Sequence, residues 1–530
     1  MFAKQFLGKT AAVTFPALAA VHLVAIPLQH NDLPSAVALA LVGVAACALT
    51  ARSLVWGLVL AFAEIIAGGH GHLLAADIAG FPLSLRMAVF AGVMLGYVWH
   101  VARRRVRPTF LVFRDTPFLL LAIAVAIGTV HGMLANDPLH AFDDMNGYFT
   151  LAYLLPLASV AWDNTTRRAL LQGMFASVMW VALSTLAIVF LFTHLPGWML
   201  HDVYAFVRDA RIAEVTLLTG PDWFVGNLLP DASPWYFRVF EPAHFFVLVL
   251  GLILVAARFL LWKGERMPHM ARVAFTLCVA AFIASLSRSF LIGAAAGLCA
   301  TAVFVGVDAP RAIGRHLLRS LPLLFLVFLG AGVFWATVVF PFPSHPNLQD
   351  AAFYRETESD DRDLAVSSRW NLLYPMFTAI MEHPVVGAGF GKEVTFISDD
   401  PRVRDINPSG EWTTYRFEWG YQDIWLKMGL LGLVAFVWYL VVLSRAFYFS
   451  YLRHGHRWLV TGLYAGVIAL FATHVFSPYL NHPIGLGFML FVLPFFDWQG
   501  VVASFAKEDE ARAKESVVKV PTPVVTMRGE

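Results

Sequence analysis

The stretch ALLQGMFASVMWVALSTLAIVFLFTH, residues 169–194, contains no Asp, Glu, Lys or Arg. A helix that crosses the hydrocarbon core of a bilayer needs about 20 mostly apolar residues, because its backbone must satisfy its own hydrogen bonds there. Similar runs recur along almost the whole chain of 530 residues, of which 58% are hydrophobic and only 14% are charged. With a mean hydropathy of +0.66, this composition indicates a membrane protein. It excludes a soluble enzyme, a disordered scaffold and a secreted disulfide-rich domain.

The apolar runs predict an all-α, polytopic membrane domain over residues 1–500 with about fourteen membrane-spanning helices. The third, sixth and last runs are short for a full crossing. The expected spans are 11–29, 34–51, 53–68, 83–101, 116–134, 147–162, 169–194, 242–262, 270–286, 289–307, 320–341, 424–446, 458–476 and 483–498.

Lys and Arg residues are concentrated in alternate short loops, which predicts that these loops and both chain termini are cytoplasmic. The intervening short loops, such as 69–82 and 135–146, contain neither residue type. The basic residues are Lys4 and Lys9; Arg52; Arg103, Arg104, Arg105 and Arg107; Arg167 and Arg168; Lys263, Arg266 and Arg272; Arg311 and Arg315; and Arg453 and Arg457.

This orientation places two long segments, 195–241 and 342–423, on the far side of the membrane. The first is rich in aromatic residues, and we expect it to contain an amphipathic helix in the membrane interface. The second is expected to form a small, partly helical module, with a helix from Arg369 to Met381 and a tight glycine turn in VVGAGFG, residues 385–391. The charged and then Pro/Val-rich tail, 501–530, predicts a flexible cytoplasmic extension.

Four arginines on the far side are not explained by the orientation rule: Arg86, Arg238, Arg288 and Arg369. An ionisable residue at the membrane boundary is costly and therefore indicates a functional site. Guanidinium groups stay charged and bind phosphate through paired hydrogen bonds, so several of them suit a diphosphate at the headgroup level. Any one of them could instead pair with a carboxylate, as Arg238 could with Glu241. Arg288, in SLSRSFLIG, is the strongest candidate because its connection is so short.

Two carboxylates, Glu418 and Asp423, lie in FEWGYQDIWLKMGLLGL at the entrance of a late span. A carboxylate that is partly shielded from water can accept a proton from an attacking hydroxyl. The alternative is that Glu418 only pairs with Arg416 or Lys427 at the headgroup level.

We expect no metal, no cofactor and no nucleic-acid partner. Cys47, Cys278 and Cys299 all lie within apolar runs, and His70 and His72 are simpler to interpret as loop residues than as metal ligands. The glycines of VVGAGFG lack the Lys-Ser/Thr of a phosphate-binding loop. The net charge of +2 offers no strongly basic surface for nucleic acid.

The chain resembles the superfamily of O-antigen ligases and polysaccharide polymerases, which are polytopic bacterial membrane glycosyltransferases. The resemblance rests on SLSRSFLIGAAAG (285–297), on RWNLLYPMFTAIMEHPVVGAGFG (369–391), and on GLLGL (429–433) entering a late span after a large loop. It covers residues 80–500 in layout and the later half of the chain in motif.

The resemblance implies a fold like that of the C-type glycosyltransferases, in the bacterial inner membrane, with a periplasmic active site. Members transfer a glycan from an undecaprenyl-diphosphate carrier to an acceptor hydroxyl, on a lipid A-core or on another glycan, without a metal ion. Arginines matching Arg288 and Arg369 would hold the diphosphate, and Arg86 and Arg238 fit by position. Ligases of this family usually carry a His where this chain has Glu418, which makes Glu418 the candidate catalytic base beside Arg288.

Three functions remain open from the sequence. A ligase and a repeat-unit polymerase use the same donor and are not separated by these motifs. A transporter or flippase would bury charges at the bilayer midplane and show repeated halves, and neither feature is found here. Trp370 and Trp412, with Trp223 and Trp235, could stack on sugars or anchor the chain at the membrane interface.

Overall fold

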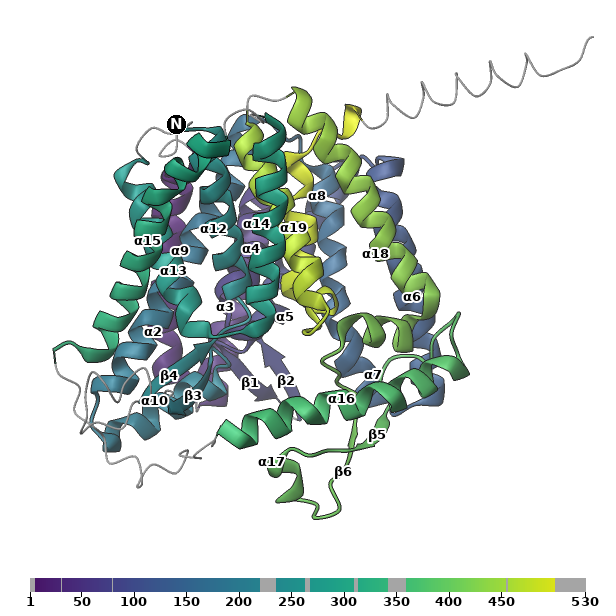
Figure 1. Cartoon of the computed structure of the whole chain (residues 1–530). Helices are drawn as coiled ribbons and strands as arrows, with labels where there is room; N and C mark the ends of the chain where they lie inside the picture. Colours follow the sequence, from purple (N-terminus) through teal and green to yellow (C-terminus); the bar gives the residue numbers. More distant parts are fainter. Residues whose placement is uncertain are drawn as a thin grey trace, which may run out of the picture.

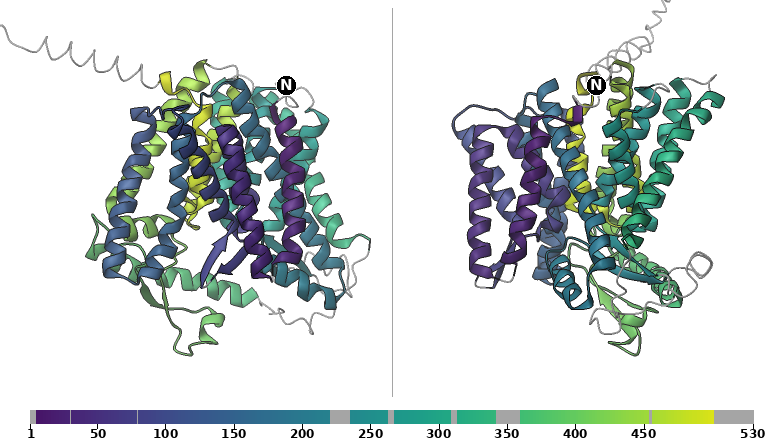
Figure 2. Two further views of the ribbon diagram at one scale, coloured as in Figure 1. Left: turned by 180° about the vertical axis from the view of Figure 1, so that it is seen from behind. Right: turned by 90° about the vertical axis from the view of Figure 1, so that its left-hand side faces the viewer.

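The protein is a bundle of long helices that run side by side, with three two-stranded hairpins and helix α16 gathered at one end (Figure 1). The computed structural model describes residues 5–29, 31–78, 80–219, 235–262, 267–308, 313–341, 359–453 and 456–500. We call the end with the hairpins the hairpin end. The two further views place α16 and the hairpins at the same end of the bundle (Figure 2).

Eight helices of the described ranges are long and apolar enough to cross a membrane. The chain is therefore a polytopic, mainly helical membrane protein, as its sequence predicts, while the count of fourteen spans stays a prediction. The eight helices are α2 (Lys9–Leu28), α3 (Asp32–Arg52), α5 (Leu85–Ala102), α6 (Val112–Ala135), α9 (Asn164–His194), α14 (Arg288–Asp308), α15 (Ile313–Val339) and α18 (Gly420–Arg453). Shorter helices complete the bundle: α4 (Leu54–Ala67), α12 (His244–Leu260), α13 (His269–Ser285), α19 (Arg457–His474) and α20 (Pro483–Phe491).

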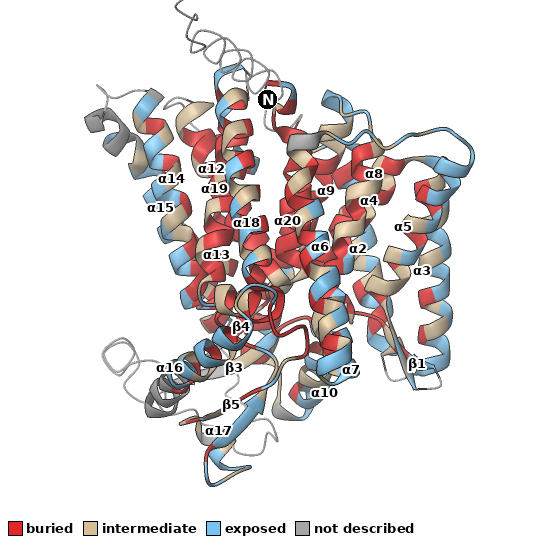
Figure 3. Ribbon diagram, turned by 90° about the vertical axis from the view of Figure 1, so that its right-hand side faces the viewer, coloured by how far each residue is buried: buried red, intermediate tan, exposed pale blue. Residues whose placement is uncertain are grey.

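The centre of the bundle is formed by helices that are buried on nearly every side, whereas outer helices expose large apolar side chains (Figure 3). In α12, residues Phe245 and Phe246 are fully buried, while Leu41 and Val44 of α3 are largely exposed. Lipid is as apolar as these side chains, so an outer helix needs no polar face.

Small residues let the helix backbones approach closely. A Cβ atom on Gly92 of α5 would lie 2.3 Å from the carbonyl oxygen of Gly43 in α3, and one on Gly297 of α14 would lie 3.0 Å from that of Ala465 in α19. Without a hydrophobic driving force between helices in lipid, such close packing supplies much of their association energy.

Residues 147–162 differ from the single span that the sequence predicts. They form a 3₁₀ segment, η2 (Asn146–Tyr153), followed by the short helix α8 (Leu154–Ser159). The break lies where Gly147 packs against the chain, since a Cβ on it would lie 2.9 Å from the carbonyl oxygen of Asn481. Irregular backbone is tolerated at membrane depth where other parts of the protein cover it.

The two long segments contain strands that the all-α prediction did not include. The first carries α10 (Gly197–Asp209) and the antiparallel pair β3 (Glu214–Thr219) and β4 (Trp235–Phe240), in which Thr216 lies opposite Arg238. The second carries α16 (Ser359–Glu382), α17 (Pro401–Arg404) and the antiparallel pair β5 (Val394–Ile397) and β6 (Glu411–Thr414). The third hairpin pairs β1 (Ala75–Ile78) with β2 (Phe81–Ser84).

The helix predicted from Arg369 to Met381 lies within α16. The predictions for the tail 501–530, for Trp223 and for residues 342–358 fall outside the described residues.

The predicted glycine turn follows α16 and is wedged between two helices. Gly387, Gly389 and Gly391 have φ angles of +85°, +84° and +74°, which favour glycine. A Cβ on Gly387 would lie 2.6 Å from the backbone nitrogen of Gly429 in α18, and one on Gly389 would lie 2.4 Å from that of Gly132 in α6. The turn thus joins the second long segment to both helices.

We predict that Gly387→Ala lowers the free energy of unfolding by about 2 kcal/mol or more, because it adds a steric clash to the cost of the left-handed backbone. Gly80→Ala is the matched control, since Gly80 has a φ of +82° with nothing within 4 Å of its Cβ position. It should lose only about 1–2 kcal/mol. Unfolding of the purified protein in detergent measures both values, and equal losses would show that the turn is not tightly packed.

Candidate functional site at the hairpin end

The connection between α19 and α20, residues 475–482, contacts α14, the Trp419 ring, His70 and Asp423. Its Ser477 Oγ lies 3.1 Å from Ser289 Oγ at the start of α14, and the ring of Phe476 lies 5.4 Å from that of Trp419. At its other end, the ring of His482 lies 5.1 Å from that of His70. We call this segment the α19–α20 connection.

Arg288 is the first residue of α14 and is exposed. The turn before it places Leu286 in the left-handed region, with a φ of +43°, and buries Ser287 and Ser289 on either side of Arg288. Among the residues that the structure describes, none forms a hydrogen bond or an ion pair with the side chain of Arg288.

Arg238 lies on β4 and reaches the same turn. Its Nε donates a hydrogen bond of 2.9 Å to the carbonyl oxygen of Ser285, and its guanidinium lies 4.9 Å from the ring centre of Phe240. Glu241, the carboxylate suggested as its partner by the sequence, is instead buried and accepts a hydrogen bond of 3.2 Å from Thr185 Oγ1. Burial raises the pKa of Glu241 to about 8, although the bond from Thr185 acts to lower it.

Arg369 and Glu418, two of the predicted site residues, form an ion pair. Both side chains are about half exposed, at 51% and 49%. Trp419 fixes the neighbouring backbone, because its Nε1 donates a 2.8 Å hydrogen bond to the carbonyl oxygen of Arg369. The two residues that the sequence offered as alternative partners of Glu418 are paired elsewhere: Arg416 with Asp143, and Lys427 with Asp144 and Asp423.

Arg86 lies at the start of α5, beside the His482 end of the α19–α20 connection. Its Nε lies 3.1 Å from Oε1 of Glu64, which is almost fully buried in α4. Burial, together with the positive charges of Arg86 and Arg211, lowers the pKa of His70 to about 3. His70 is therefore neutral at pH 7, and Arg86 supplies the positive charge at this position.

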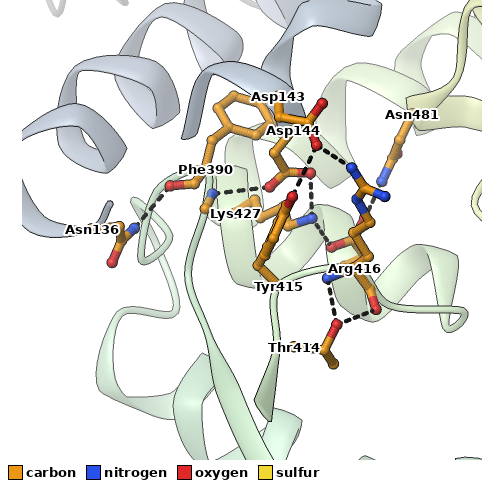
Figure 4. A network of polar contacts seen from close by, with 11 residues as sticks. Asn136, Asp143, Asp144, Phe390, Thr414, Tyr415, Arg416, Lys427 and Asn481 are labelled. Carbon is orange, nitrogen blue, oxygen red and sulfur yellow. Dashed lines mark hydrogen bonds and ion pairs between the residues drawn. The ribbon is translucent and has the colours of Figure 1, made fainter. Parts of the chain in front are cut away.

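A buried network joins the module formed by the second long segment to the bundle (Figure 4). Lys427 Nζ lies 2.6 Å from Asp144 Oδ1 and 2.6 Å from Asp423 Oδ1, and all three side chains are nearly buried. Asp144 also accepts a 3.0 Å hydrogen bond from the backbone nitrogen of Gly391, and Asp423 accepts one from Asn481 of the α19–α20 connection. One ammonium group thus links α7 (Pro138–Met145), α18, the glycine turn and this connection.

Asp143, next to Asp144, is the more exposed carboxylate of the same network. It accepts hydrogen bonds from Tyr415 and Arg416, which lead from β6 to α18 (Figure 4). Partial burial acts to raise the pKa of Asp143, but the bonds from Arg416 and Tyr415 hold it below its usual value.

The structure gathers Arg238, Arg288 and the Arg369–Glu418 pair around the Ser477 end of the α19–α20 connection, and Arg86 at its His482 end. The described residues include no group of three or more His, Cys, Asp or Glu side chains that could hold a metal ion. His70 and His72, the weak metal hint in the sequence, adjoin Arg86 and Arg211 instead.

The role of the α19–α20 connection was not predicted from the sequence, because this short loop contains no Lys or Arg. The signal was present in HVFSPYLNHP, residues 474–483, where polar, histidine and proline residues interrupt two apolar runs. Asp144 and Arg211, whose partners are distant in sequence, were also missed.

These features define a polytopic membrane protein whose candidate site residues lie at the hairpin end of the helical bundle. The model of the family described as O-Antigen ligase matches residues 273–437, from α13 into α18. The chain thus carries a domain of the O-antigen ligase and polymerase superfamily, which confirms the resemblance seen in its sequence. Members of this family are glycosyltransferase-like enzymes, either ligases or polymerases. No curated protein and no solved structure matches the chain.

The matched region includes Arg288, Arg369 and Glu418 but not Arg86 or Arg238. The first three residues therefore belong to the part of the chain that matches the family model.

We predict that Lys427→Met lowers the free energy of unfolding by about 3–5 kcal/mol, because it leaves two buried carboxylates without their cation. Replacing Asp144 and Asp423 by Asn in the same chain should recover part of this loss. The matched control removes an exposed pair: Arg208 Nε lies 2.7 Å from Asp209 Oδ1 with exposures of 59% and 36%. Arg208→Ala should cost about 0–1 kcal/mol. Unfolding in detergent measures each variant, and a Lys427→Met value as small as that of Arg208→Ala would contradict a structural role for the network.

Proposed function

We propose that the protein is an O-antigen ligase-like glycosyltransferase. It moves a glycan from an undecaprenyl-diphosphate carrier to an acceptor hydroxyl, such as one on a lipid A-core. The observation that carries this proposal is the Arg369–Glu418 ion pair, which lies within the region matched by the family model. Trp419, next to Glu418, contacts the α19–α20 connection, and the same connection contacts the start of α14.

In this proposal the protein lies in the bacterial inner membrane, with the hairpin end in the periplasm and both termini in the cytoplasm. The basic loops support this orientation. α5 begins beside β2 at the hairpin end and leads at its other end to Arg103, Arg104 and Arg105, and α18 likewise ends at Arg453. An excess of Lys and Arg marks the cytoplasmic side of a membrane protein.

The donor diphosphate would be held by Arg288 and Arg369, with Arg238 beside them and Arg86 further along the connection. Arg288 is exposed, and both side chains of the Arg369–Glu418 pair are about half exposed, so a phosphate can reach both guanidinium groups. Guanidinium binds phosphate oxygens through two parallel hydrogen bonds, which fixes the orientation of the diphosphate as well as its charge.

Glu418 would act as the base. When the diphosphate binds Arg369, it competes with the carboxylate of Glu418 and releases it. The acceptor oxygen then attacks the anomeric carbon, its proton passes to Glu418, and the bond from that carbon to the diphosphate oxygen breaks. The electron pair leaves on the diphosphate, where the arginines, rather than a metal ion, stabilise the developing negative charge.

We predict that deletion of the gene leaves full-length glycan on the undecaprenyl carrier and removes it from the lipid A-core. Arg288→Ala should restore transfer at a rate lower by about 10²–10³-fold, because a donor to the developing charge is lost. Arg208→Ala is the control, as an exposed arginine of α10 outside the site. Analysis of both glycolipids measures the outcome. Accumulation of single repeat units would indicate a polymerase, and unchanged glycans on both lipids would favour a transporter.

We predict that Glu418→Gln lowers the transfer rate by about 10²-fold or more, because general base catalysis is lost. The donor should bind no more weakly, because the carboxylate that competes for Arg369 is removed. Glu393→Gln is the matched control. Glu393 is similarly exposed, at 48%, and its Oε1 lies 3.0 Å from Nδ1 of His140. Transfer by the purified protein in nanodiscs measures kcat and KM separately. A Glu418→Gln rate equal to that of Glu393→Gln would rule out Glu418 as the base.

A further inference from the structure

We propose that a groove between α16 and the β5–β6 hairpin binds the sugar chain of the donor, an inference that rests on the proposed function. The groove has a volume of about 620 Å³ and is open to solvent. One wall is formed by Trp370, Asn371 and Tyr374 of α16, and the other by Thr395, Phe396 and Glu411 of the hairpin. Its size lies in the range of pockets that hold small ligands.

The side chains of the groove suit a carbohydrate. Trp370 and Tyr374 are 57% and 80% exposed, although aromatic rings of this size are normally buried. A sugar ring has an apolar face of C–H groups that packs on an aromatic ring, and hydroxyls at its rim that need polar partners. Thr395 and Glu411 supply such partners beside the rings.

The walls of the groove are held by hydrogen bonds rather than by a ligand. Asn371 Nδ2 donates to the carbonyl oxygen of Ile397 at 3.3 Å and to Asp399 Oδ2 at 2.8 Å, and the hydroxyls of Ser368 and Ser398 lie 2.6 Å apart. These bonds tie α16 to β5 and the residues that follow it. These bonds fix the two walls relative to each other, which reduces the entropy that sugar binding must offset.

Membrane lipid is the other apolar partner for exposed aromatic rings, but the position of the groove opposes it. The hairpin lies on the side of α16 away from the helical bundle (Figure 1). The hairpin wall of the groove is therefore separated by α16 from the helices that would cross the membrane. Phe377 and Met381, further along α16, are also exposed but do not line the groove.

The groove continues directly into the site. The rings of Trp370 and Trp419 meet edge to face with centres 5.0 Å apart, and Trp419 follows Glu418 in the chain. Arg369, which would hold the donor diphosphate, precedes Trp370 on α16. A sugar chain attached to that diphosphate would therefore leave the site alongside the aromatic wall.

The test uses the full-length protein in nanodiscs and two soluble probes. One probe is the polysaccharide that mild acid releases from the surface of the cells of origin, and the other is their core oligosaccharide. We expect the wild type to bind the polysaccharide, and Tyr374→Ala to bind it about tenfold more weakly, since a stacking partner is lost. Trp370→Ala should do the same. Tyr374→Ala is the cleaner variant because Tyr374 is not in contact with Trp419.

Phe377→Ala is the matched control, an exposed aromatic of the same helix outside the groove, and should bind the polysaccharide like the wild type. In transfer assays, Tyr374→Ala should raise KM for the lipid-linked donor and leave kcat unchanged. Three outcomes would each overturn the proposal. All variants could bind the polysaccharide equally, or Tyr374→Ala and Phe377→Ala could lose equal affinity. The third outcome is that the groove residues affect binding of the core oligosaccharide alone. If the wild type binds the polysaccharide through the groove but transfers no glycan, the proposed function fails and the groove stands. If it transfers glycan and Tyr374→Ala behaves like the wild type, only the groove fails.

Discussion

The ammonium group of Lys427, buried between Asp144 and Asp423, constrains the positions of α7, α18, the glycine turn and the α19–α20 connection. A charge that is removed from water must remain paired, since breaking such a pair costs several kcal/mol. This requirement fixes the first two turns of α18 against α7 and, through Asn481, against the α19–α20 connection. Glu418 and Trp419 directly precede α18, so their positions follow from the same constraint.

The ion pairs of the hairpin end fall into two kinds with different consequences. The pair between Lys427 and Asp144 is nearly buried, and no ligand can exchange with it. The pair between Arg369 and Glu418 is half exposed, and such pairs contribute at most about 1 kcal/mol. A diphosphate carries more charge than one carboxylate and can displace it. The buried pair therefore suits a scaffold, and the exposed pair suits a site that must open for a substrate.

The sequence predicts the helical membrane bundle because runs of about 20 apolar residues leave few alternatives. It does not predict which residues meet across the fold. The sequence offered Arg416 and Lys427, its neighbours along the chain, as alternative partners of Glu418, but Glu418 forms an ion pair with Arg369. The three hairpins were missed because their strands are only four to six residues long. The α19–α20 connection was missed because its role depends on position rather than on charge.

In the proposed function, the three parts of a lipid-linked glycan require different surroundings, and each would meet a different surface of the chain. Its prenyl chain needs hydrocarbon, which the exposed apolar side chains of the outer helices adjoin. Its diphosphate needs fixed positive charge at the membrane boundary, where α14 begins with Arg288 and where Arg238 meets the preceding turn. Its sugars need water and aromatic faces, which the groove of α16 supplies further from the bundle. Transfer would then take place at Glu418, where the second and third of these surfaces meet, so the anomeric carbon is positioned by binding on both sides of the bond that breaks.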